Sequence, residues 1–136
     1  RSRVARDPTQ PNLRQVHLLQ GELLDELAAA GFAVPPGALG ENITTRGIDL
    51  LALSTGTMLR LGDDVLVAVT GLRNRCRQIE NFQDGLLDRV LDRGADGRLI
   101  RRAGVMGVVV RGGKVAVGAT IEAQPPPGRY IRLEPV

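Results

Sequence analysis

The chain has 136 residues and a mass of 14.6 kDa, which suits one compact domain with a hydrophobic core. Hydrophobic residues make up 43% and charged residues 24%, a composition that excludes intrinsic disorder as a description of the whole chain. Its single cysteine excludes an internal disulfide framework, and no apolar run approaches the ~18 residues of a membrane-spanning helix. We therefore expect a cytoplasmic protein with no membrane partner.

The net charge of +3 is carried by 17 arginines and one lysine. Because the guanidinium fork matches phosphate and carboxylate, this bias predicts an anionic partner. A GC-rich genome, which encodes basic residues as arginine, explains the same bias, and both explanations stand. Nucleic acid is disfavoured as the partner, since three aromatic residues provide no stacking platform for bases and no zinc or RNA-binding motif is present.

The first elements follow a polar start. Residues 1–13 carry prolines and no hydrophobic period, so we expect an irregular segment. The alternation over Arg14–Leu19 predicts a short strand. Leucines then recur at helical spacing opposite acidic residues, which predicts an amphipathic helix over residues 21–30, ended by Gly31.

Several short strands follow. After the turn-rich residues 35–42, glycine-bounded apolar runs predict two adjacent strands over Thr57–Leu61 and Val65–Thr70. Helix-forming residues over Asp84–Asp92 predict a second helix, ended by Gly94.

The last third of the chain has the pattern of a hairpin. Gly104–Arg111 is rich in β-branched residues, and the Gly112–Gly113 pair that follows is typical of a tight turn. We expect the second arm over Lys114–Gly118, extended through Thr120–Ala123 and stopped by three prolines. Short strands with glycine turns and two isolated helices predict a mainly β fold with a few helices, a barrel or a sandwich.

Cys76 is the first candidate for chemistry. Arginines stand three and one positions before it and one after it, at Arg73, Arg75 and Arg77, and their charge favours the thiolate, which is a nucleophile and a soft-metal ligand. The alternative is a buried cysteine that only fills space. His17 is the only histidine, which excludes a site of several histidines; it is either a satisfied structural residue or the imidazole partner of the thiolate.

Residues 37–45 form the second candidate. Glycines with successive N–H groups can bind an anion, and Asn42, Thr44 and Thr45 add side-chain donors. No known phosphate-loop motif is present, so a structural turn that caps the next element is the alternative.

Three segments resemble the MOSC domain, which occurs at the C-terminal end of molybdenum-cofactor sulfurases and as small stand-alone bacterial proteins. They are Gly37–Gly47 (GALGENITTRG), Thr70–Cys76 (TGLRNRC) and Gly104–Gly113 (GVMGVVVRGG). The resemblance covers about Arg14 to Ile121, and it is specific in the order and spacing of a GENxTTxG stretch and an Arg-x-x-Cys.

The resemblance implies a β-barrel-like MOSC domain over residues 14–123, with an irregular segment at 1–13, where the family has upstream strands, and a C-terminal extension at 124–136. It also implies that Cys76 is the catalytic residue, as a molybdenum ligand or a persulfide carrier. The residues that would hold the molybdenum cofactor (molybdopterin) are Gly40, Glu41, Asn42, Thr44, Thr45 and Arg73.

Two functions follow as expectations from this resemblance. The first is a molybdenum-cofactor-binding or sulfur-carrying protein, a component of a molybdenum-dependent reductase or a sulfur transferase. The second is a non-catalytic accessory module that delivers cofactor or sulfur to a partner enzyme. Since the chain has no iron–sulfur or flavin motif, reducing power for an oxidoreductase would come from a redox or molybdoenzyme partner chain.

Overall fold

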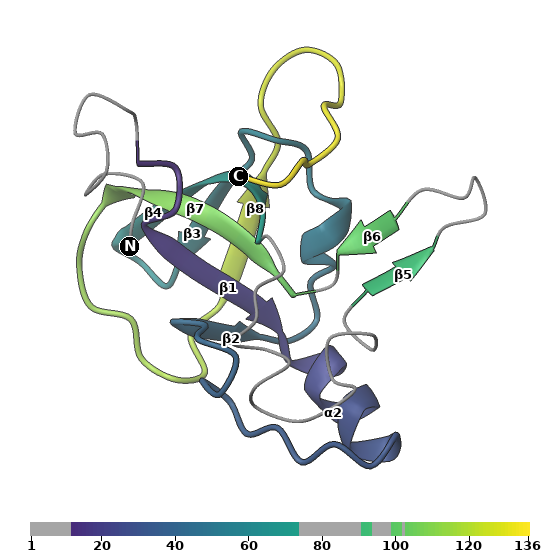
Figure 1. Cartoon of the computed structure of the whole chain (residues 1–136). Coiled ribbons are helices and arrows are strands. Elements are labelled where there is room, and N and C mark those ends of the chain that lie inside the picture. Colours follow the sequence, from purple (N-terminus) through teal and green to yellow (C-terminus); the bar gives the residue numbers. More distant parts are fainter. Residues whose placement is uncertain (1–11, 74–90, 94–98, 102) are drawn as a thin grey trace.

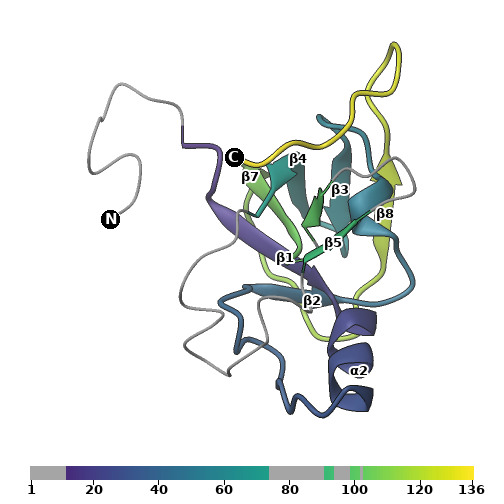
Figure 2. The same ribbon diagram turned by 45° about the vertical axis from the view of Figure 1, so that its right-hand side comes forward.

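The structure is a computed structural model that describes residues 12–73, 91–93, 99–101 and 103–136. Its main feature is a curled six-stranded sheet in the order β2-β1-β7-β4-β3-β8 (Figure 1, Figure 2). The strands of this sheet are β1 (Val16–Gln20), β2 (Ile43–Thr45), β3 (Met58–Leu61), β4 (Val65–Leu72), β7 (Val105–Arg111) and β8 (Ile121–Gln124). The mainly β fold predicted from the sequence is confirmed.

Strand β1 is covered on both faces. Leu18 belongs to the core between the sheet strands, whereas Leu19 packs with the leucines of α2 (Gly21–Ala29), which starts directly after β1. The strand runs parallel to β2 and antiparallel to β7. Burial of both faces explains why β1 is an apolar run rather than a clean alternation.

Helix α2 confirms the predicted amphipathic helix. Leu23, Leu24 and Leu27 are buried at helical spacing, and the acidic side chains between them are exposed. The helix ends in a Schellman motif, in which Phe32 N–H donates to Leu27 O and Gly31 adopts a φ of 95°. Beyond β2, the apolar run that follows contains a single 3₁₀ turn, η1 (Leu50–Ala52).

Strands β3 and β4 confirm the predicted adjacent pair. They are antiparallel, with Leu61 opposite Val65, and β4 alternates buried and partly exposed residues along its whole length. The buried side chains of both strands pack against Leu18, Leu50 and Val105 to form the main core.

The predicted hairpin after β7 is wrong. Lys114–Gly118 contains no strand, and β8 pairs with β3 instead of with β7. Strand β7 pairs with β4 along its length and with β1 only over Val105–Gly107, whereas β8 pairs with the edge of β3. The connection from β7 to β8 therefore crosses to the far edge of the sheet.

The predicted helix over Asp84–Asp92 is wrong in the part that the structure describes. Leu91 and Asp92 belong to β5 (Leu91–Arg93), which pairs with β6 (Leu99–Arg101) in a separate two-stranded sheet. Residues 84–90 lie outside the described residues. At Leu91 and Asp92, strand pairing prevails over the local helical preference.

The C-terminal residues pack against the end of the sheet. Thr55 N–H donates to Ile131 O, Leu72 N–H donates to Glu134 O, and Leu133 is buried in the main core. Within the described part of the chain, no helix has the length and hydrophobicity needed to cross a bilayer.

Candidate functional site

Arg73, in the described part of the second MOSC-like segment, contacts both the first segment and Gly104 at the start of the third. Residues 37–45 run from a loop into β2, Arg73 follows directly after β4, and Gly104 precedes β7. Cys76, the residue with the central role in our prediction, lies outside the described residues. The described part of the site therefore consists of Arg73, the loop over residues 37–45 and the turn at Gly104.

Arg73 joins the two predicted motifs. Its side chain is 7% exposed, and its Nη1 donates a hydrogen bond to the carbonyl oxygen of Leu39, 34 residues earlier in the chain. Gly40 lies beside the guanidinium, because a Cβ built there would lie 3.6 Å from Nη2. The Arg73 N–H donates to Gly104 O at 3.0 Å. Arg73 therefore contacts the loop through its side chain and the turn before β7 through its main chain.

Glu41 points into its own loop. The carboxylate is 7% exposed, and its two oxygens accept hydrogen bonds from Leu39 N (3.2 Å) and Thr44 Oγ1 (3.3 Å). These contacts tie the start of β2 to the preceding turn. A carboxylate used in this way shapes the loop and does not itself offer a donor to an anion.

His17 contacts both the loop and the turn before β7, which the sequence did not indicate. It is 4% exposed on β1, and its main chain exchanges two hydrogen bonds of 2.8 Å with Asn42, one from each backbone N–H. Its Nε2 lies 2.6 Å from Ala103 O, and since a carbonyl only accepts, Nε2 carries the proton.

The pKa of His17 is lowered from its ordinary value of 6.5. Burial is the largest cause, and the charge of Arg73 acts in the same direction. Hydrogen bonds to the main chains of Ala103 and Gly40 and the charge of Glu41 oppose the shift. The imidazole therefore favours its neutral form beside the buried side chains of Arg73 and Glu41.

The remaining loop residues divide into an exposed and a buried set. Gly40, Asn42 and Thr44 are exposed, whereas Thr45 is 2% exposed. Among the described residues, Thr45 Oγ1 finds no hydrogen-bond partner. The loop therefore presents exposed polar groups, while the Arg73 residue that contacts it is buried.

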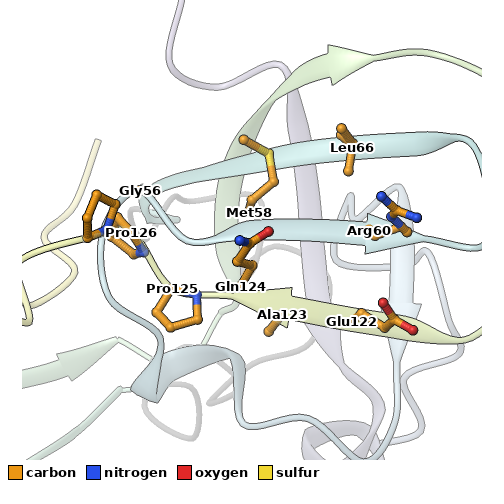
Figure 3. Close-up of a pocket in the computed structure, with 10 residues that line it drawn as sticks. Gly56, Met58, Arg60, Leu66, Glu122, Ala123, Gln124, Pro125 and Pro126 are labelled. Carbon is orange, nitrogen blue, oxygen red and sulfur yellow. The ribbon is translucent and has the colours of Figure 1, made fainter.

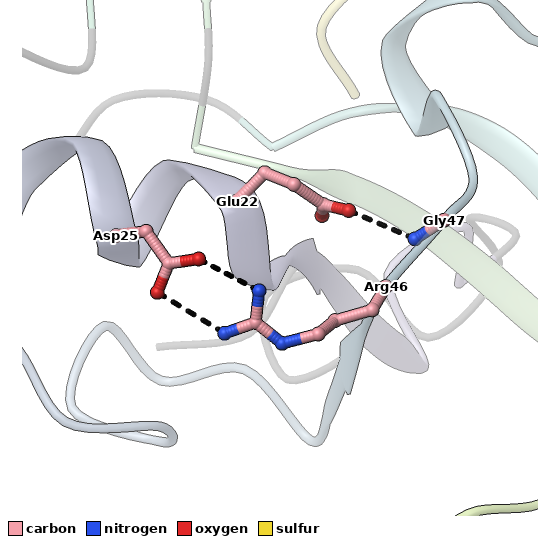
Figure 4. A network of polar contacts seen from close by, with 4 residues as sticks. All are labelled: Glu22, Asp25, Arg46 and Gly47. Atoms are coloured by element: carbon pink, nitrogen blue, oxygen red, sulfur yellow. Dashed lines mark hydrogen bonds and ion pairs between the residues drawn. The ribbon is translucent and has the colours of Figure 1, made fainter.

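Exposed polar contacts fix the exit of β2 onto α2 (Figure 4). Arg46 binds Asp25 through two hydrogen bonds of 2.7 and 3.1 Å, and Glu22 accepts one from Gly47 N at 2.8 Å. The bond from Arg46 lowers the pKa of Asp25, and the bond from Gly47 N–H lowers the pKa of Glu22. The ends of the GENxTTxG segment are therefore held by α2 on the outside and by Arg73 on the inside.

A cavity of about 710 Å³ lies at the opposite edge of the sheet, over β3 and β8 (Figure 3). Met58 and Leu66 form its apolar part, and Arg60 and Glu122 lie near one end. No residue of the motif segments lines it. In the part of the chain that the structure describes, no cluster of three or more histidine, cysteine or acidic residues could hold a metal ion.

A family model of the MOSC domain matches residues 6–122. The chain belongs to the MOSC domain family. This family is associated with molybdenum cofactor binding or sulfur transfer. The described parts of the three segments that resemble it lie close together in the fold.

Solved MOSC-like structures share the fold. The YuaD protein from Bacillus subtilis superposes with a TM-score of 0.67 at 22% identity, over 90% of this chain and 74% of that one. YiiM from Escherichia coli gives 0.62 at 21%, over 87% and 58%, and YiiM from Geobacillus stearothermophilus gives 0.62 at 20%, over 82% and 54%. This chain thus spans little more than half of either YiiM protein. A comparison with curated proteins found no significant match.

Proposed function

We propose that this protein binds the molybdenum cofactor, or carries sulfur for it, with Cys76 as the molybdenum ligand or the persulfide carrier. One observation carries the proposal: the hydrogen bond from Arg73 to Leu39 O joins the GENxTTxG loop to the segment that leads to the only cysteine. A loop that served only as a turn would have no reason to rest on a buried arginine next to that segment.

The exposed and buried residues have different roles in this proposal. Asn42 offers its side-chain NH2 group and Thr44 its hydroxyl oxygen to the pterin, since Asn42 Oδ1 and the Thr44 hydroxyl proton already make hydrogen bonds within the fold. The exposed Gly40 lies beside Arg73 Nη2, next to the charge that would attract the phosphate. Arg73 supplies a buried positive charge next to the loop, and Glu41 stabilises the loop conformation through its hydrogen bonds to Leu39 N and Thr44 Oγ1.

Cys76 lies three residues after Arg73, a length of chain that spans at most about 11 Å. In this proposal the Cys76 thiol reaches the ligand that the loop holds. The three arginines nearby favour the thiolate, which is the form that binds molybdenum and accepts sulfur. The cofactor, when bound, supplies the redox chemistry of molybdenum, and the chain binds and orients it.

The test compares freshly purified wild-type protein with Cys76→Ala, and with Arg60→Ala as a control at the far edge of the sheet. We expect molybdenum and pterin to be retained by the wild type and the control and lost by Cys76→Ala. A mass increase of about 32 Da on Cys76 distinguishes persulfide carriage from ligation. Equal molybdenum and pterin in Cys76→Ala, together with an unmodified thiol in the wild type, would refute the role of Cys76.

A further inference from the structure

We propose that His17 is a positioning residue, which holds the Gly40 loop and the Ala103–Gly104 turn against Arg73 and so sets the affinity of the site. The inference rests on the function proposed above. It concerns a residue that sequence reasoning left as either structural or a partner of the thiolate.

A closed ring of contacts carries the inference. From β1, the His17 ring reaches Ala103 O, and the next residue, Gly104, accepts a hydrogen bond from Arg73 N. The side chain of Arg73 reaches Leu39 O in the loop. Asn42 closes this circuit of contacts, because its side-chain Oδ1 accepts a hydrogen bond from His17 N–H and its own N–H donates to His17 O.

The imidazole of His17 contacts the Ala103–Gly104 turn, and the main chain of His17 contacts the loop through Asn42. The fit is close: a Cβ on Gly104 would lie 2.8 Å from His17 Nε2. Arg73 and Glu41 are the charged groups that face the imidazole, and both are buried.

Position is the role that this geometry allows. The imidazole is 4% exposed, and its Nε2 proton is given to a main-chain carbonyl, so it is not presented to a ligand. Loss of the imidazole removes the hydrogen bond to the Ala103 carbonyl. Because the next residue, Gly104, accepts a hydrogen bond from Arg73 N–H, this loss also loosens the backbone that orients the Arg73 side chain. Loss of one buried hydrogen bond corresponds to about a tenfold change in an equilibrium constant.

The decisive variants are His17→Gln, which keeps an N–H donor at a distance similar to Nε2, and His17→Leu, which has none. Thr57→Val is the matched control, because it also removes one buried hydrogen bond to a carbonyl, from Thr57 Oγ1 to Ser54 O, but in the β3 region. We expect His17→Leu to retain at least tenfold less molybdenum and pterin than the wild type. We expect His17→Gln and Thr57→Val to stay near the wild type.

Hydrogen exchange provides a second measurement that needs no cofactor. In His17→Leu we expect faster exchange at the amides of residues 39–42 and of Arg73, with unchanged exchange in β3, and the reverse distribution in Thr57→Val. Retention in His17→Leu equal to that of Thr57→Val, or a loss in His17→Gln as large as in His17→Leu, would overturn the inference. If the wild type holds neither molybdenum nor pterin, the proposed function fails, and the exchange pattern alone decides whether His17 positions the two segments.

Discussion

Replacing Gly104 by alanine tests the packing of the candidate site most directly. The added Cβ would lie 2.2 Å from Leu18 O and 2.8 Å from His17 Nε2, both far inside ordinary contact. Leu18 is fully buried and pairs with β2 on one side and β7 on the other, so its carbonyl has little freedom to move. The substitution therefore forces β1 and the turn before β7 apart.

Two costs add at this position. An L-residue at the observed φ of 94° is strained by about 1–2 kcal/mol. Overpacking a filled interior adds about 1–3 kcal/mol. The total is a large part of the roughly 5–15 kcal/mol by which a domain is stable.

Gly31→Ala separates the two costs. Gly31 has a φ of 95°, almost equal to that of Gly104, but nothing lies within 4 Å of its added Cβ. In urea denaturation, we expect Gly104→Ala to unfold at a midpoint lower than that of Gly31→Ala by roughly 1 M, with unchanged slope. Midpoints that agree within error would refute the close contact between β1 and the Gly104 turn.

Three smaller predictions follow. Stability should fall as the pH drops below 6.5 towards the lowered pKa of His17, because the unfolded chain binds the proton more tightly than the folded one; thermal melting of His17→Gln should lack this slope, and equal slopes would contradict it. Asp25→Asn should reduce the urea midpoint slightly, and less in about 0.5 M salt, because its pair with Arg46 is exposed to screening; a loss that ignores salt would count against this. Thr57→Val should cost about 0.5–1.5 kcal/mol, since it removes the 2.7 Å donor to Ser54 O while the Thr57 N–H donor at 3.1 Å remains, and an unchanged midpoint in urea would show the bond to be unimportant.

Local patterns predicted the elements whose partners are local. The leucines of α2 specify both the helix and its buried face, and the glycines around β3 and β4 mark a pair of strands only a few residues apart. The hairpin after β7 failed because its turn signal at Gly112–Gly113 is local, whereas the choice of partner is not. Strand β8 pairs with β3, which lies far earlier in the chain, and the sequence near the turn cannot indicate that partner.

The candidate site shows the same division. The sequence identified the loop at Gly40–Thr45 and Arg73 as separate features, and a family resemblance connected them. His17 was seen only as the lone histidine of a strand, because its ring partner, Ala103, is 86 residues away. No period or motif near residue 17 carries that information, so only the folded chain reveals it.

The cost of this cluster is itself an argument for function. Glu41, Arg73 and His17 are each at most 7% exposed, and burying charged groups opposes folding unless hydrogen bonds and opposite charges compensate. The contrasting pair of Asp25 and Arg46 keeps more than 60% of each side chain in solvent, where an ion pair costs little and contributes little. Titratable groups gathered in the interior are typical of sites that must control charge, and a loop needed only for shape could rest on apolar side chains. The buried cluster beside residues 39–42 therefore supports the proposal that this loop binds an anionic cofactor.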